Sequence, residues 1–184
     1  MQYQPSFRNT EILNLNDNRR QSRGSRVSEV WVFQAVPTRY RILDALRNEN
    51  LQEDVWIVRE YKNRIRAGHL GLIWKAKTRT TDDMGIYAVV NIVSNPAEMV
   101  DSEQSTQYWV NDNDKRRLRP RVRFRRRLIL LDNPITKPEL MGIPATRNME
   151  IITKRRGTNF KVTPNEWETI LGLIQQRRPN FRPQ

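Results

Sequence analysis

The chain has 184 residues and no cysteine, which excludes disulfide bonds, thiolate metal sites and cysteine nucleophiles. Its single histidine, His69, argues against a histidine-based metal site and against a Ser-His-Asp triad. The 33 Lys and Arg residues outnumber the 20 Asp and Glu residues, and the resulting net charge of +13 favours a polyanionic partner, nucleic acid before an anionic membrane surface.

No apolar run approaches the roughly 18 residues that a membrane span needs, and no signal-peptide core is visible. We therefore expect no membrane partner and a cytoplasmic location, or a nuclear one in a eukaryotic cell.

Composition divides the chain into three parts. Residues 1–28 are rich in Asn, Gln, Ser and Arg, carry a net charge of +3, and are predicted to form a disordered or loosely packed basic tail. Residues 29–176 contain the apolar runs of one domain and still carry +7. Residues 177–184 add +3 and are predicted to form a basic C-terminal tail. The basic character is thus not confined to the tails.

The first strongly apolar run, Val30-Trp31-Val32-Phe33-Gln34-Ala35-Val36-Pro37, predicts a β-strand, because β-branched and aromatic residues fit a half-buried sheet and the proline ends the ladder. On an ideal strand Phe33 and Gln34 point to opposite faces, so that if one lines a site the other is in the core. Residues 121–125 alternate basic and apolar, which is typical of a half-buried strand with one basic face. Further strands are predicted at residues 54–58, 70–76 and 86–93.

Helical signals separate these strands. Residues 40–46 have apolar positions at helical spacing, with Thr38 as the expected N-cap. The polar segment 97–114 is expected to be a long loop, residues 137–141 a short helical turn, and residues 149–152 a short extended piece. The clearest helix is 163–174, because Thr163, Pro164 and Glu166 match the N-cap, N1 and N3 preferences ahead of an apolar stripe.

Strands separated by short helices, with no glycine-rich phosphate loop after any of them, argue against a doubly wound fold. The sequence instead predicts an α+β class: a mixed β-barrel or curled sheet of about five to six strands, with short peripheral helices and a C-terminal helix.

Five segments in the same order resemble the EVE domain, a member of the PUA-like superfamily that is related to YTH domains. They cover about residues 30–174 of the chain. The chain departs from the family pattern in three places: Ala35-Val36 replaces Gly-Asn, His69 replaces an acidic residue, and Val90 replaces a glycine in a strand. The segments are Trp31-Val32-Phe33-Gln34-Ala35-Val36-Pro37, Trp56 with Arg59, Ile65-Arg66-Ala67-Gly68-His69 leading into Leu72-Ile73-Trp74, Gly85-Ile86-Tyr87-Ala88-Val89-Val90, and Arg156-Gly157-Thr158-Asn159-Phe160-Lys161-Val162-Thr163-Pro164.

This resemblance implies a non-catalytic reader that holds a flipped, often modified base in an aromatic-walled pocket. Core packing is the alternative for each tryptophan, and shaping a turn is the alternative for Asn159 and Phe160. Gln34 carries an amide that suits a base edge. The candidate pocket residues are Gln34, Ala35, Trp56, Trp74, Lys75, Trp109, Asn159 and Phe160.

Basic residues near these segments are candidates for phosphate contacts. Residues 115–127 alone contain nine Lys and Arg in thirteen positions, although a solvated surface is the alternative for any such run. The candidates are Arg59, Lys62, Arg64, Arg121, Arg123, Arg125, Lys154, Arg155 and Arg156.

Two other functions remain open. A scaffold or RNA-associated protein would bind through charge alone. A nucleic-acid-modifying enzyme is less favoured, because no paired carboxylates, metal cluster or cofactor loop is recognisable. We expect no cofactor and no metal, and a separate effector protein as a further partner is left open. The sequence leaves open DNA or RNA, the modification, and the oligomeric state.

Overall fold

The computed structural model describes residues 28–79, 83–111, 117–154 and 156–183, so the expected N-terminal tail lies almost wholly outside the described residues. The described strands form one mixed sheet in the order β2-β6-β4-β3-β1-β8, with β5 paired to β6 and β7 paired to β4. Only β1 and β3 are parallel among these pairs. The strands are β1 (Val30–Ala35), β2 (Glu53–Ile57), β3 (Leu70–Lys75), β4 (Gly85–Ile92), β5 (Ala97–Met99), β6 (Arg119–Ile129), β7 (Ile135–Thr136) and β8 (Asn159–Val162).

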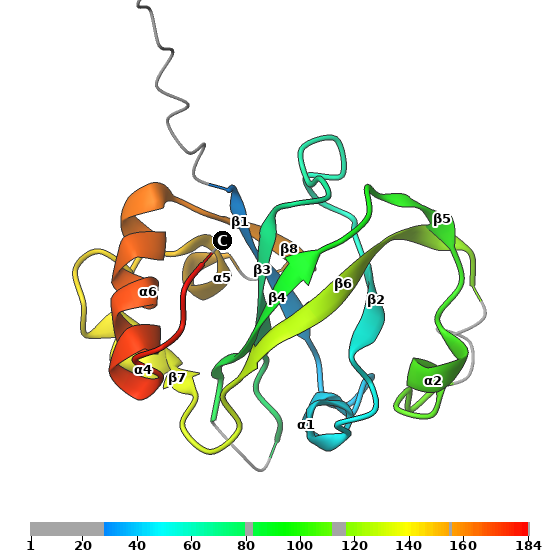
Figure 1. Cartoon of the computed structure of the whole chain (residues 1–184), viewed down its shortest axis with the longest axis horizontal. Coiled ribbons are helices and arrows are strands. Elements are labelled where there is room, and N and C mark those ends of the chain that lie inside the picture. Colours follow the sequence, from blue (N-terminus) through cyan, green and yellow to red (C-terminus); the bar gives the residue numbers. More distant parts are fainter. Residues whose placement is uncertain (1–27, 80–82, 112–116, 155, 184) are drawn as a thin grey trace, which may run out of the picture.

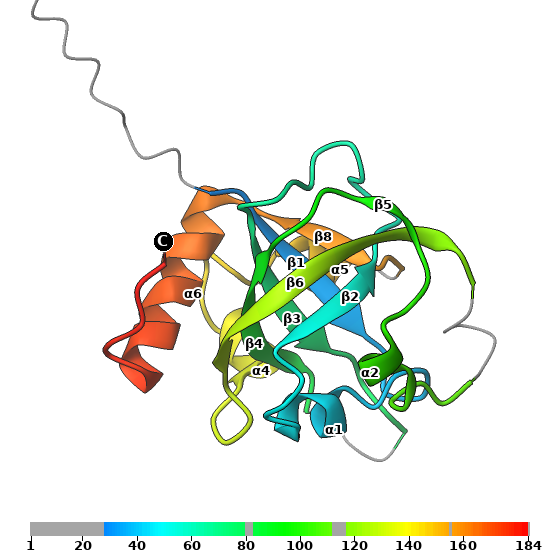
Figure 2. The ribbon, with the colours of Figure 1, turned by 45° about the vertical axis from the view of Figure 1, so that its right-hand side comes forward.

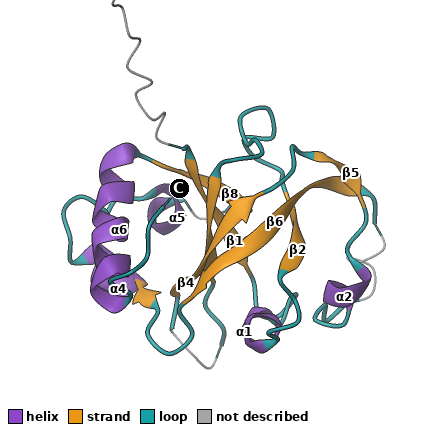
Figure 3. Cartoon of the chain, viewed as in Figure 1, coloured by secondary structure: helices purple, strands orange, loops and turns teal. Residues whose placement is uncertain are grey.

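The sheet is strongly curled, as Figure 2 shows, and short helices surround it. α4, α5 and α6 lie together on one side of the sheet, whereas α1 and α2 lie toward its other end (Figures 1 and 3). This is the α+β architecture that the sequence predicts, a curled mixed sheet with short peripheral helices and a C-terminal helix. The helices are α1 (Ile42–Arg47), α2 (Glu103–Thr106), α4 (Lys137–Met141), α5 (Glu150–Thr153) and α6 (Pro164–Arg177).

Two hydrophobic cores lie on the two faces of the sheet. Along β1, side chains alternate between the cores: Val30 and Val32 enter one, and Trp31, Phe33 and Ala35 enter the other. The outer core, which α6 covers, contains Val32, Leu72, Trp74, Phe160, Trp167 and Ile170. The inner core, inside the curl, contains Trp31, Phe33, Tyr40, Trp56, Ile73 and Phe124.

The C-terminal helix begins as its sequence predicts. The Thr163 hydroxyl accepts from the Glu166 backbone N–H at 3.4 Å, and the Glu166 carboxylate accepts from the Thr163 backbone N–H at 2.7 Å, which completes a capping box. Pro164 follows the cap, and the helix continues to Arg177, beyond the predicted end at residue 174. Among the described residues, no helix has the length and apolar character to cross a bilayer.

Several local expectations were wrong. The segment 97–114 is not a plain loop, because it contains β5 and α2. Residues 150–153 are helical, not extended, and α1 begins after Arg41 without a side-chain cap from Thr38.

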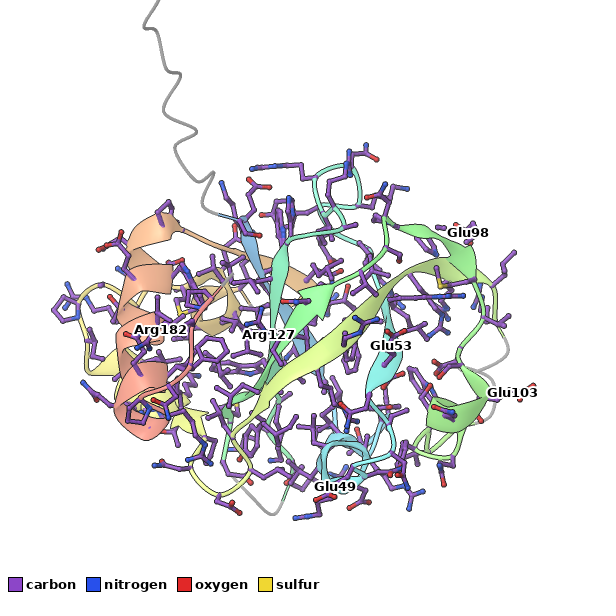
Figure 4. All side chains as sticks on the ribbon, in the orientation of Figure 1. Glu49, Glu53, Glu98, Glu103, Arg127 and Arg182 are labelled. Carbon is purple, nitrogen blue, oxygen red and sulfur yellow. The ribbon has the colours of Figure 1, made fainter. Side chains whose placement is uncertain are left out.

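The described C-terminal residues 177–183 contact the domain. The Phe181 ring is 9% exposed and packs on the outer core. The Arg127 guanidinium lies 5.7 Å from that ring and donates to the Arg182 carbonyl at 2.9 Å; both arginines are labelled in Figure 4.

Candidate functional site

The curl of the sheet brings its two ends, β2 and β8, to the same place. There the two strands are joined by hydrogen bonds of a side chain, where paired strands would use backbone hydrogen bonds. The Asn159 amide donates to the Ile57 carbonyl at 3.2 Å and accepts from the Arg59 backbone N–H at 2.9 Å. We call this junction of residues 57–60 with residues 158–159 the seam. Asn159 is 1% exposed, and both ends of its amide bond to backbone groups of this junction.

Glu60 supports the same junction. Its carboxylate accepts from the Thr158 backbone N–H at 2.9 Å, the Thr158 hydroxyl at 2.6 Å and the Asn159 backbone N–H at 3.2 Å. Burial raises the pKa of Glu60, but the Thr158 and Asn159 donors outweigh burial and lower it below the usual range. The carboxylate is therefore ionised at neutral pH and fixes the start of β8.

A pocket opens beside the seam, at the end of β1. Its cavity volume is about 70 Å³, and counting the open mouth it contains about 600 Å³ of empty space. Three aromatic side chains, Tyr40, Trp56 and Trp109, contribute to its walls. The full lining is Gln34, Ala35, Val36, Arg39, Tyr40, Val55, Trp56, Ile57, Arg59, Trp109 and Thr158.

Tyr40 is central to the aromatic arrangement. Its ring centroid lies 5.6 Å from that of Trp56, with planes at 83°, and 5.2 Å from that of Trp109, with planes at 65°. These are edge-to-face contacts of the kind that aromatic pairs prefer. The Tyr40 hydroxyl donates to Asp54 Oδ2 at 2.7 Å. Burial, reinforced by the Asp54 carboxylate, raises the pKa of Tyr40, so the hydroxyl stays protonated and holds the ring.

Trp109 is fixed from a different element. Its indole N–H donates to the Asp101 carboxylate, and the Val110 N–H beside it donates to the Arg39 carbonyl at 2.9 Å. An isolated β-bridge also joins Tyr40 to Trp109. The segment 97–114, expected to be a loop, thus supplies one wall of the pocket. Backbone contacts hold this wall against the turn that follows β1.

Arg121 does not reach the surface, contrary to the expected phosphate contact. It is 0% exposed, and its Nε donates to the Met99 carbonyl at 3.1 Å. Its Nη1 lies 3.7 Å from Asp101 Oδ1, and its guanidinium lies 5.9 Å from the Trp109 ring. The cause is β5, which pairs with β6 so that Ala97 faces Arg121 and covers this part of the basic strand.

The structure brings together four of the eight expected pocket residues: Gln34, Ala35, Trp56 and Trp109. Trp74 and Phe160 do not line the pocket, because strand alternation places both in the outer core. Lys75 is also apart, since its 3% exposed side chain forms an ion pair with Asp83.

The remaining phosphate candidates are scattered. Arg59 is exposed and lines the pocket. Lys62, three residues after Arg59, and Arg156, two residues before the pocket residue Thr158, are also exposed. Arg123 is exposed on β6, and Arg155 lies outside the described residues. Three have carboxylate partners: Arg64 with Glu29 at 2.7 Å, Arg125 with Glu53 at 2.6 Å, and Lys154 with Glu150 at 2.9 Å.

Sequence reasoning missed Arg39, to which we assigned no role, and Tyr40, which we assigned only to a helix start. After β1, the Val36 carbonyl accepts from the N–H groups of both Arg39 and Tyr40, at 2.8 and 3.0 Å. This turn places both side chains at the pocket. The signal was available, since Pro37 stops a strand just ahead of a basic-aromatic pair. Among the described residues, no three His, Cys, Asp or Glu side chains lie close enough to hold a metal.

Comparison with known proteins gives a consistent result. The EVE domain family model matches residues 29–173. Similar solved structures include a hypothetical protein from Leishmania major (17% identity, covering 82% of this chain and 97% of that one, TM-score 0.59). They also include human THYN1 protein in complex with DNA containing 5-methylcytosine (18% identity, 79% and 97%, TM-score 0.56) and protein PSPTO5229 from Pseudomonas syringae (16% identity, 78% and 98%, TM-score 0.55). At these identities the likeness shows the fold alone. No curated protein matches the chain.

Proposed function

Because the chain belongs to the EVE domain family, we propose that it is a non-catalytic nucleic-acid-binding module that takes a flipped, modified base into the pocket beside the seam. The observation that carries this proposal is the pocket itself: Tyr40, Trp56 and Trp109 wall a space at the end of β1, and Arg39 and Arg59 are at its lining. The human THYN1 complex makes 5-methylcytosine the first modification to test.

The energetics are adequate for such a reader. Flipping a base out of a stack costs a few kcal/mol. Each base stacked on an aromatic side chain regains roughly 1–3 kcal/mol. A buried methyl group adds about 0.8 kcal/mol, which favours a methylated base over the plain one.

Polar groups suited to a base edge are also present at the pocket. Among the described residues, the Gln34 side-chain amide has no hydrogen-bond partner, so it keeps both its donor and its acceptor for a ligand. Just after β2, the Val58 N–H donates to Pro120 on β6 at 2.8 Å, so alternation turns the peptide groups of Val55 and Ile57 the other way, toward the seam. There the Val55 N–H donates to Asp54 Oδ1 at 2.7 Å and the Ile57 carbonyl accepts from Asn159, so the Val55 carbonyl and the Ile57 N–H are the peptide groups left for a base edge. Both residues line the pocket.

Phosphate contacts follow from the exposed cations beside the mouth. We propose that Arg39 and Arg59 contact the phosphates next to the flipped nucleotide. Lys62, Arg156 and Arg123 are further exposed cations, and each adds charge without base selectivity.

The test is fluorescence anisotropy with matched single- and double-stranded oligonucleotides containing cytosine, 5-methylcytosine, 5-hydroxymethylcytosine, adenine or N6-methyladenine, over a salt series. We expect one modified base to be preferred, and the preference to persist at high salt. Replacing Trp56 by alanine is expected to lower affinity for that base by about tenfold or more, the loss of one stacking partner. Trp56→Phe, which keeps an aromatic ring, is the matched control, and circular dichroism checks that both variants fold.

Arginine variants separate the charge contribution. Arg59→Ala and Arg39→Ala should each weaken binding to all oligonucleotides and lower the salt slope by about one. Arg147→Ala, an exposed arginine in the α4–α5 connection, should change neither. Equal affinity for every base, collapsing with salt, would contradict the reader and leave a charge-only scaffold.

A further inference from the structure

Two buried carboxyl groups hold two of the three aromatic walls. Asp54 on β2 is 4% exposed and accepts from the Tyr40 hydroxyl; Asp101, after β5, is 8% exposed and accepts from the Trp109 indole. The Ser105 hydroxyl donates to Asp101 Oδ1 at 2.8 Å. The shape of the pocket therefore depends on acceptors that lie behind its walls.

Asp101 is surrounded mainly by hydrogen-bond donors. Besides Trp109 and Ser105, the Ser102 N–H donates to its Oδ1 at 3.0 Å, and Arg121 on β6 faces it at 3.7 Å. An ionised carboxylate accepts from all of these groups. Because Oδ1 already accepts from Ser102 and Ser105, a proton on this carboxyl goes to Oδ2, the oxygen that accepts from the indole N–H, and there it competes with the indole N–H.

The other charged and titratable groups near the pair do not remove this conflict. Tyr40 is already a donor to Asp54, and Arg126 on β6 directs its guanidinium to the Ala45 and Asn48 carbonyls, each at 2.8 Å. Tyr108 accepts from the Asn48 amide at 2.8 Å. Burial raises the pKa of both carboxyl groups, and in Asp101 burial together with the neighbouring Asp54 raises it to about 6. A surface hollow on the outer side is lined by Glu53, Asp54, Asp101, Ser102 and Arg123, so protons have a route to the pair.

We propose that Asp101 is a positioning residue whose protonation releases the Trp109 wall, so that base selectivity is lost in mildly acidic solution. This inference rests on the proposed function, since it states how the same pocket is regulated. It adds that the pocket is complete only when the carboxyl behind Trp109 is ionised.

The first test uses the free protein and needs no ligand. In a two-dimensional ¹H–¹⁵N NMR spectrum, each of the five tryptophans contributes one indole N–H signal, and Trp109→Phe identifies that of Trp109. We expect this signal to shift with pH, with a midpoint near 6, and Asp101→Asn to abolish the shift. A Trp109 signal that does not move, or that still titrates in Asp101→Asn, would overturn the inference.

His69 is the matched control for this titration. Its Nδ1 accepts from the Trp31 indole at 3.0 Å on the other side of the inner core, and burial lowers its pKa. His69→Gln should alter the Trp31 signal and leave the Trp109 titration unchanged. If the Trp109 titration disappears in His69→Gln, the histidine is the titrating group and the inference fails.

The second test compares affinities for a modified-base oligonucleotide and its plain counterpart. We expect the preference to fall about tenfold between pH 7.5 and pH 5.0 in the wild-type protein, which is the change in the ionised fraction of one group with a pKa of about 6 and a loss of the size that one stacking partner contributes. Asp101→Asn should show little change over the same range. A wild-type preference that is independent of pH would overturn the inference even if Trp109 titrates. If no oligonucleotide is preferred at any pH, the proposed function fails, and the NMR titration still decides whether Asp101 controls Trp109.

Discussion

Replacing Asn159 by alanine tests whether the seam holds the curled sheet closed. The change removes the donor to the Ile57 carbonyl and the acceptor of the Arg59 N–H, at 3.2 and 2.9 Å, from a residue that is 1% exposed. Leaving a buried polar group without its partner costs about 1–3 kcal/mol. Both backbone groups lie near the surface, where water regains part of this cost, so we expect a loss of about 2–4 kcal/mol. A domain of ordinary stability would lose a large fraction of its total.

Urea unfolding, followed by tryptophan fluorescence and circular dichroism together, measures this loss. Asn63→Ala, at an exposed asparagine whose side chain makes no hydrogen bond among the described residues, should stay within about 0.5 kcal/mol of the wild type. Asn159→Asp keeps the acceptor but loses the donor and adds a charge beside Glu60, so at neutral pH it should destabilise at least as much. A loss below about 1 kcal/mol for Asn159→Ala would refute the role that we assign to the seam.

Three further predictions concern stability. Glu60 has a lowered pKa, so its contribution to the free energy of unfolding is present above pH 4.5 and is lost as the pH falls through the lowered value. In urea unfolding, the difference in stability between the wild-type protein and Glu60→Gln should therefore shrink in acid. Asp101 has a pKa raised from 3.8 to about 6, so its contribution is fully present below pH 3.8 and is lost as the pH rises through 6. Relative to Asp101→Asn, the wild-type protein should therefore lose roughly 3 kcal/mol between pH 4 and pH 7; no difference would contradict the burial argument. Phe181→Ala should cost roughly 1–3 kcal/mol, because a terminal segment collapses more readily than a core, whereas Pro183→Ala should cost little; equal effects in thermal unfolding would show that the C-terminal segment is not docked.

Local signals in the sequence predicted much of the fold. The apolar runs located β1, β3 and β4, and the Thr163-Pro164-Glu166 pattern located the start of α6, because strands and caps depend on residues that are near neighbours. The segment 97–114 was wrongly predicted to be a loop, because its structure depends on contacts with residues that are distant in the sequence. β5 is an Ala-Glu-Met strand with weak intrinsic preference, and only pairing with β6 makes it a strand.

The site was half predictable. Gln34 and Trp56 stand at strand ends that the sequence identifies, and both line the pocket. Trp74 could not be separated from them, since its face depends on how β3 packs against the C-terminal helix, which is a tertiary fact. The burial of Arg121 likewise required knowledge of β5, because alternation alone gives Arg121, Arg123 and Arg125 the same face.

The seam also constrains how the chain folds. Arg59 and Asn159, which bond at the seam, are 100 residues apart in the sequence. The β1–β8 pair likewise forms only after almost the whole domain has been synthesised. These are among the least local contacts of the domain. Non-local pairing of this kind slows folding, because a long loop must close before any contact rewards it. During synthesis, the end of β1, β2 and the aromatic walls exist well before residues 158–162 leave the ribosome. Until then the edge of β2 is open, so a chain truncated before β8 should expose that edge to other chains and have no closed pocket.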